Sequence, residues 1–213
     1  MSGWYQQGFD AVDKLPDVSK QNRFWLKVGE ERQIVFLDKD PFTFWEHQVR
    51  LNGEWRYYFT CLKNLNKPCP LCDAKVKRYF VGLFSIIDVS SYIAKDGKEV
   101  KNPVKLMAIK QKALKLLKRH DDKGRILHGL FNVVRTDDKA GTSGDMFEFE
   151  QKVNPLEYNP KATVFDYEKE CKPLEHEALA TIASMAEPDP YANAGKEVPV
   201  VAAVADDSDN VPF

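Results

Sequence analysis

Apolar and polar residues alternate over short stretches along most of the chain, which is typical of β-strands that bury one face. Residues 23–28 and 32–37 are two such stretches, and the turn-forming residues 29–31 between them predict a first hairpin. Residues 43–61 predict a second hairpin, because Asn52-Gly53 at its centre is the strongest short hairpin signal in the sequence.

The apolar run 80–89 is long enough to predict a central strand. Asp96-Gly97 marks a further turn, and we expect additional strands at 104–109, 130–135 and 146–149. Several short strands of this kind favour a small barrel over a parallel sheet with helices on both faces.

Helical patterns are few. Residues 110–120 place apolar side chains on one side and lysines on the other, which predicts a short amphipathic helix. A second helix is expected at 174–185, and residues 73–79 are a candidate for a further short one. The predicted fold class is therefore mostly β, an OB-fold-like barrel with one or two short helices.

Composition indicates a packed core, since 43% of the 213 residues are hydrophobic and 12% are aromatic. No apolar run approaches the roughly 20 residues of a membrane span, and the first residues lack the features of a signal peptide. We expect a soluble, intracellular protein without a membrane partner. Three of the four cysteines are clustered, so a disulfide framework is not expected, and Cys171 is most simply a reduced thiol.

One imidazole and three thiols lie close together in the sequence, at His47, Cys61, Cys69 and Cys72. A CxxC turn presents two thiolates to one tetrahedral ion, and the predicted hairpin brings the other two ligands toward it. A thioredoxin-like redox pair is an alternative, although that motif opens a helix in a βαβ unit. His47 can alternatively be a half-buried histidine without a metal. Three thiolates alone would leave the open position of a catalytic zinc, so we expect a closed, structural Cys3His zinc site.

Charge divides the chain into a basic body and an acidic end. Residues 187–213 carry six acidic side chains against Lys196 alone, which leaves 30 basic and 26 acidic side chains in the preceding residues. We expect an N-terminal arm at 1–19, a domain at 20–186 with a zinc-stabilised insertion at about 43–80, and a disordered acidic tail.

Cations and aromatic rings are interleaved at several places in the predicted barrel, as in proteins that bind single strands through phosphate contacts and base stacking. Many such rings are core residues and many such charges are solvated, so the individual assignments are hypotheses. The cations expected to contact phosphates are Arg23, Lys27, Arg50, Arg56, Lys75, Lys77, Arg78 and Lys105. The rings expected to stack on bases are Trp25, Trp45, Trp55, Tyr57, Tyr58 and Phe80.

The acidic tail finishes with three aspartates and an apolar end, comprising Asp206, Asp207, Asp209, Val211, Pro212 and Phe213. Such a sequence suits docking into a basic, apolar-lined pocket on a partner protein, although a merely solubilising tail is an alternative.

The His-x13-Cys-x7-Cys-x2-Cys order, the basic and aromatic barrel and the acidic tail together resemble the single-stranded DNA-binding proteins of tailed bacteriophages. The chain is similar to the zinc-containing helix-destabilising proteins of T4-like phages, although its first two cysteines are closer together. The resemblance implies an OB fold that holds single-stranded DNA and a zinc subdomain beside the cleft. It also implies a tail that recruits replication and recombination proteins and competes with DNA. The location it implies is the cytoplasm of an infected bacterial host.

Residues 1–19 contain only Lys14 as a cation, so we do not find in them the basic arm that gives those relatives cooperative binding. We expect a non-enzymatic protein, because Asp88, Asp121 and Asp122 are scattered rather than clustered as a hydrolase would need. The alternative functions are a zinc-stabilised regulator of duplex DNA, for which 110–120 would be a poor recognition helix, or a nuclease accessory protein.

Overall fold

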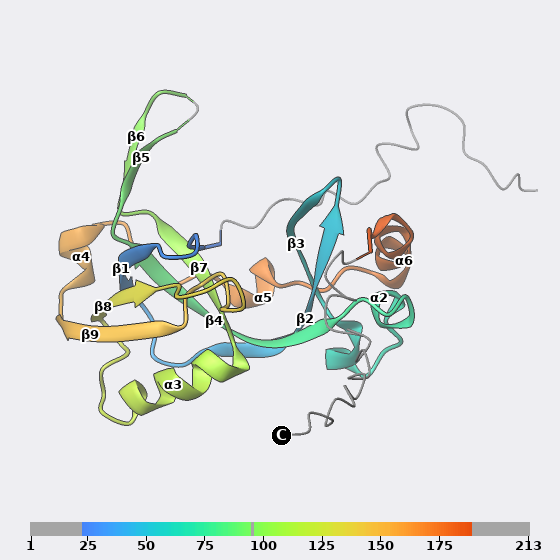
Figure 1. Ribbon diagram of the computed structural model, residues 1–213, viewed down its shortest axis with the longest axis horizontal. Helices are drawn as coiled ribbons and strands as arrows, with labels where there is room; N and C mark the ends of the chain where they lie inside the picture. The colour runs from blue at the N-terminus through green and yellow to red at the C-terminus, as the bar shows by residue number, and fades with distance from the viewer. Residues whose placement is uncertain (1–22, 95, 189–213) are drawn as a thin grey trace, which may run out of the picture.

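The computed structural model describes residues 23–94 and 96–188, which are built around a seven-stranded antiparallel sheet (Figure 1). Its strands are β1 (Glu31–Phe36), β2 (Phe42–Leu51), β3 (Glu54–Thr60), β4 (Arg78–Asp88), β7 (Val104–Lys110), β8 (Gly129–Val134) and β9 (Met146–Lys152). Two short strands, β5 (Ser91–Ile93) and β6 (Glu99–Lys101), form a separate ribbon that projects from the body (Figure 1).

Strand β4 is the centre of the sheet, as the apolar run predicts. One edge of β4 pairs with β7, and the other edge pairs first with β2 and then with β1. The sheet continues from β2 to β3 and from β1 through β8 to β9. Since no pairing within the described residues joins its ends, the sheet does not close into the barrel expected from the sequence. The mostly β, antiparallel architecture is confirmed.

The second predicted hairpin is confirmed as β2 and β3. Its turn residues Asn52 and Gly53 have φ angles of 52° and 77°. Two successive positive φ angles are typical of a type I′ turn, whose backbone twist matches the twist of the two strands that it joins. The first predicted hairpin is wrong. The amides of Phe24 and Leu26 donate to the carbonyls of Leu106 and Thr142, so residues 24–28 follow distant segments instead of pairing with β1.

The helices are short. They are the 3-10 turn η1 (Leu62–Leu65) and the α-helices α2 (Pro70–Asp73), α3 (Gln111–Asp121), α4 (Pro155–Tyr158), α5 (Tyr167–Glu170) and α6 (His176–Met185). Helices α3 and α6 confirm two predictions. The helix expected at 73–79 is wrong, because the helix begins earlier, at Pro70, and the chain leaves it through Lys75 at a φ of 60°. No helix in the described residues is long and apolar enough to cross a membrane.

Two apolar cores matter for the site. The main core lies between the sheet and α3 and contains Phe36, Phe84, Met107 and Phe131 among its buried side chains. The second, which we call the metal-side core, joins the β2–β3 hairpin, η1, α2 and α6. Its buried residues are Val49, Leu51, Phe59, Cys61, Leu62, Cys69, Leu71, Leu179 and Ile182.

Candidate metal centre and nucleic-acid cleft

The side chains of His47, Cys61, Cys69 and Cys72 converge in the metal-side core, and their ligand atoms all lie within 4.8 Å of one another. His47 Nε2 is 3.5 Å from the sulfurs of Cys69 and Cys72, and the sulfurs of Cys61 and Cys72 are 3.6 Å apart. Tetrahedral zinc with ordinary bond lengths would separate two sulfurs by about 3.8 Å and a sulfur and a nitrogen by about 3.6 Å. These separations fit one tetrahedral ion, and all four cysteines of the chain are free thiols.

Each ligand is placed by an ordinary local structure. His47 lies within β2, and Cys61 follows the end of β3, where its amide donates to the carbonyl of Trp45 at 2.9 Å. Cys69 precedes the first residue of α2, and Cys72 lies inside that helix. The sequence therefore correctly predicts that the four residues form one cluster, which can bind a metal ion.

His47 is oriented for ligation by the backbone. Its Nδ1–H donates to the carbonyl oxygen of Val76 at 3.0 Å, which leaves the lone pair of Nε2 directed at the thiols. Burial lowers the pKa of His47 and so favours the neutral imidazole, which is the form that binds metals.

The cysteines differ in acidity. Burial raises the pKa of Cys72 to about 12, and the neighbouring thiols of Cys61 and Cys69 add to this rise. Burial also acts to raise the pKa of Cys69, but hydrogen bonds from the amides of Cys72 and Leu62 and from the Cys61 thiol outweigh it. The pKa of Cys69 is therefore lowered. A bound cation would favour the thiolate form of all three residues.

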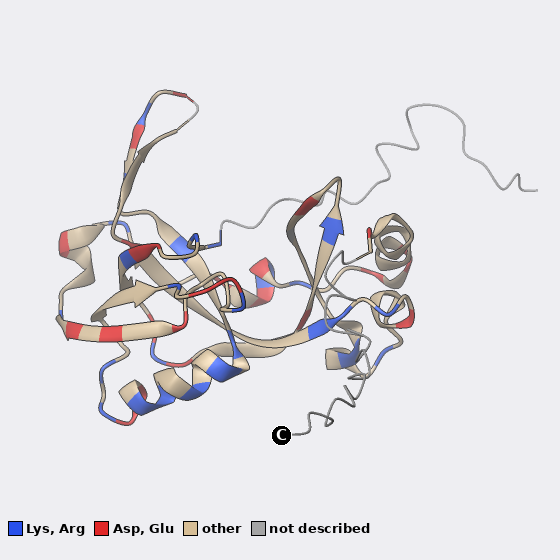
Figure 2. Cartoon of the chain, in the orientation of Figure 1, with Lys and Arg blue, Asp and Glu red and all other residues tan. Residues whose placement is uncertain are grey.

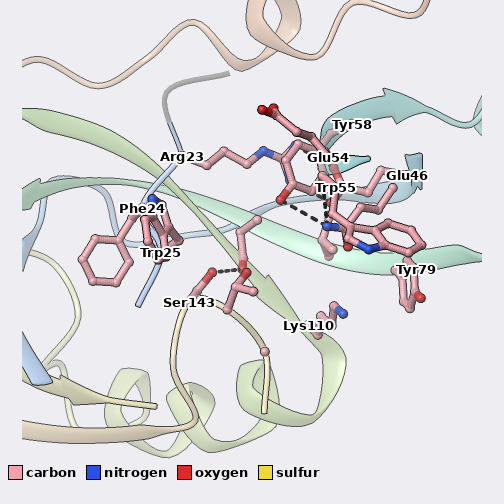
Figure 3. Close-up of a pocket in the computed structure, with 15 residues that line it drawn as sticks. Arg23, Phe24, Trp25, Glu46, Glu54, Trp55, Tyr58, Tyr79, Lys110 and Ser143 are labelled. Atoms are coloured by element: carbon pink, nitrogen blue, oxygen red, sulfur yellow. Dashed lines mark hydrogen bonds and ion pairs between the residues drawn. The ribbon is translucent and has the colours of Figure 1, made fainter. Parts of the chain in front are cut away.

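A pocket of about 500 Å³ opens on the other side of the β2–β3 hairpin (Figure 3). Figure 3 shows Trp25 on one side of this pocket and Trp55, Tyr58 and Tyr79 on the other. A second pocket of about 580 Å³ shares Gln48, Trp55 and Tyr79 with the first, so the two adjoin. We refer to both together as the cleft.

The cleft combines rings with cations. The Lys110 ammonium lies 4.3 Å from the centre of the Tyr79 ring, and the Lys77 ammonium lies 5.2 Å from it. Burial lowers the pKa of Lys110. Arg23 lies 3.7 Å above the Tyr58 ring and is bound by both carboxylate oxygens of Glu46, at 2.8 and 2.7 Å. The charge of Arg23 is thus already balanced inside the protein.

Seven of the residues predicted to bind nucleic acid line the cleft, namely Arg23, Trp25, Arg50, Trp55, Tyr58, Lys75 and Lys77. The structure brings these residues together from β2, β3, the segment before β1 and the loop that follows α2. Arg50 additionally forms a 3.3 Å ion pair with Glu187.

Three predicted residues lie on the opposite face of the sheet. Trp45 pairs with Phe80 across β2 and β4, whereas Glu46 pairs with the cleft residue Tyr79. Successive residues of a strand point to opposite faces, so Trp45 and Phe80 point away from the cleft. Arg78 goes with them, since its guanidinium lies 4.5 Å from the centre of the Trp45 ring.

Three other predicted residues do not line the cleft, and the structure does not describe the side chain of a fourth. Tyr57 packs against the metal-side core, and Lys105 is held by the buried carboxylate of Asp88 at 2.7 Å. Lys27 is exposed and does not line the cleft. Arg56 lies within β3, but its side chain is outside what the structure describes.

Sequence reasoning missed Tyr79 and Lys110. The alternation along 75–80 is visible in the sequence, but it cannot tell which face of the strand meets the cleft. In the sequence, Lys110 resembles the other lysines of the predicted 110–120 helix. In the structure it is the last residue of β7 and points into the pocket. Its position depends on where the strand ends.

The predicted arm at 1–19 and the tail residues Asp206, Asp207, Asp209, Val211, Pro212 and Phe213 lie outside the described residues. No family model matches the chain, and the comparison with curated proteins finds no match.

Proposed function

We propose that the protein binds single-stranded DNA in the cleft, without catalysing a reaction. The proposal rests on one observation, which is that four aromatic rings and three lysines line one continuous surface. The rings are Trp25, Trp55, Tyr58 and Tyr79, and the lysines are Lys75, Lys77 and Lys110. Aromatic side chains stack on any base, and lysines neutralise phosphates, so such a surface suits unpaired strands of any sequence.

The three lysines are the cations best placed for phosphates. No carboxylate within the described ranges forms an ion pair with Lys75, Lys77 or Lys110, whereas Arg23 and Arg50 are paired with Glu46 and Glu187. Arg23 is therefore a support for the cleft wall in this proposal, and the lysines make the contacts.

Zinc is the metal that the donor set suits best, because three thiolates and one imidazole in tetrahedral arrangement are the usual ligands of structural zinc. Its role here is to brace the cleft. His47 lies beside the cleft residue Gln48 in β2, and Val76, which orients His47, lies between the cleft lysines Lys75 and Lys77. A bound ion would supply folding energy to this small core.

The fold type, the biological setting and the partner proteins are part of the same proposal. An OB fold is a five-stranded, partly open barrel, and β1, β4, β7, β8 and β9 are the strands that would correspond to it. The biological setting would be replication, recombination or repair of phage DNA in an infected bacterium. Partner proteins would bind the acidic segment that contains Asp206, Asp207, Asp209, Val211, Pro212 and Phe213.

A titration of the zinc-loaded full chain with fluorescent oligo-dT and with a duplex of equal length, at several salt concentrations, tests this function. We expect tight, sequence-tolerant and salt-sensitive binding that prefers the single strand. Equal or stronger binding to one duplex sequence would instead indicate a regulator, and cleavage of the oligonucleotide would indicate a nuclease activity.

A further inference from the structure

A third hollow, which we call the α3–β9 groove, lies between α3 and β9 and shares no lining residue with the cleft. Its volume is about 630 Å³. The apolar lining comprises Leu116 from α3 and Val134 from β8 together with Met146, Phe147 and Phe149 from β9. Leu116 and Met146 are 38% and 57% exposed, so part of this apolar surface faces solvent.

Two arginines stand at the groove. Arg125 lies 5.0 Å from the centre of the Phe149 ring, and Arg119 is an exposed residue of the last turn of α3. Neither arginine forms an ion pair with a carboxylate in the part of the chain that the structure describes. Figure 2 shows that α3 carries further cations along its length, which adds positive charge on this side of the groove.

The other polar groups at the groove are His120, Asn132, Asp145 and Glu148. Nδ1 of His120 is buried and has no hydrogen-bond partner among the described residues. Asp145 is already engaged, because it accepts from the amide and the hydroxyl of Thr136 at 2.9 and 2.6 Å. Glu148 is the remaining acidic side chain. The two arginines are the groups at the groove that an acidic occupant would contact, and the apolar lining would receive its apolar side chains.

We propose that the α3–β9 groove binds residues 206–213 of the same protein. The aspartates at 206, 207 and 209 would approach Arg119 and Arg125, while Val211 and Phe213 would cover the apolar floor. The outer edge of β9 has no partner strand in the described part of the sheet, so an extended segment can also add backbone hydrogen bonds there.

The length of the chain permits this contact. Seventeen residues separate Pro188, the last described residue, from Asp206. Fully extended, they span roughly 55–60 Å, which exceeds the width of a domain of this size at roughly 40 Å. The segment can therefore reach the groove of its own chain or that of a neighbouring copy. Because the groove and the cleft are separate, docking there leaves the cleft accessible to DNA.

Photo-cross-linking tests the proposal in the metal-loaded full chain. Benzoylphenylalanine replaces Phe213, and peptides cross-linked to it are identified by mass spectrometry. We expect cross-links to residues 116–125 and 146–149, either within one chain or between two chains. A second probe at Tyr191, nearer the domain, should not label these residues.

Matched variants separate specific docking from general attraction to basic surface. The pair Arg119→Glu and Arg125→Glu should lower the cross-link yield at least tenfold, whereas Lys112→Glu with Lys115→Glu, which removes the same charge from α3 outside the groove, should change it less than twofold. Cross-links confined to Trp25, Trp55 or Tyr79 of the cleft, or equal losses with both charge reversals, would overturn the proposal.

Discussion

Replacing Trp55 with alanine tests whether the rings of the cleft stack on bases. Trp55 borders both halves of the cleft, at the end of the β2–β3 hairpin. Its hydrogen bond from Gln48 is accepted by the backbone carbonyl, at 2.7 Å, so that contact survives the substitution. Stacking contributes about 1–3 kcal/mol per base, so the dissociation constant of the variant should be roughly 5- to 150-fold larger than that of the wild type.

Trp45→Ala is the matched control. Trp45 is 37% exposed and also lies beside a cation and a ring, Arg78 and Phe80, but on the opposite face of the sheet. Fluorescence anisotropy of labelled oligo-dT measures the affinity, and thermal melting checks that both variants fold. We expect Trp45→Ala to change affinity less than twofold. Unchanged binding by Trp55→Ala, or an equal loss in both variants, would refute the assignment of the cleft.

Three further substitutions test other parts of the structure. Lys77→Ala should lower the magnitude of the log–log salt slope of oligo-dT binding by about 0.7, one phosphate contact, whereas the exposed helix variant Lys112→Ala should leave the slope unchanged. Leu179→Ala opens a cavity in the metal-side core and should cost about 2–5 kcal/mol in urea unfolding, while Leu127→Ala, at a site 40% exposed, should cost far less. Burial raises the pKa of Asp38 in the folded protein. As pH rises from near 3.5, below the ordinary Asp pKa of about 3.9, to 7, the stability of the wild type relative to Asp38→Asn should therefore fall. A relative gain in stability over this range would contradict the predicted sign.

The parts of the fold that the sequence predicts correctly are those with a strong local signal. Asn52-Gly53 demands positive φ angles, and the amphipathic pattern of 110–120 requires one buried face, so the hairpin and α3 form as expected. The segment 23–28 has a strand-like pattern, but its amides find partners near Leu106 and Thr142. The spacing of apolar residues within one segment does not reveal hydrogen bonds to segments that are distant in the sequence.

The metal ligands are predictable for a similar reason, since their chemistry is specific and three of the four lie within a dozen residues. The cleft residues are harder to predict. Alternation puts Trp45 and Glu46, and likewise Tyr79 and Phe80, on opposite faces of their strands, yet only the packing of the metal-side core decides which face meets the cleft. Helix α6 reaches this core from a distant part of the sequence and contributes Leu179 and Ile182.

Metal removal shows whether the cleft depends on zinc, because the ion should hold the hairpin that carries the cleft. Oligo-dT affinity is measured on the full chain with one zinc bound and again after chelation. We predict an affinity at least tenfold lower in the chelated protein, restored when zinc is added back. Equal affinity before and after chelation, or purified protein that binds no metal, would show that the cleft does not depend on a bound ion.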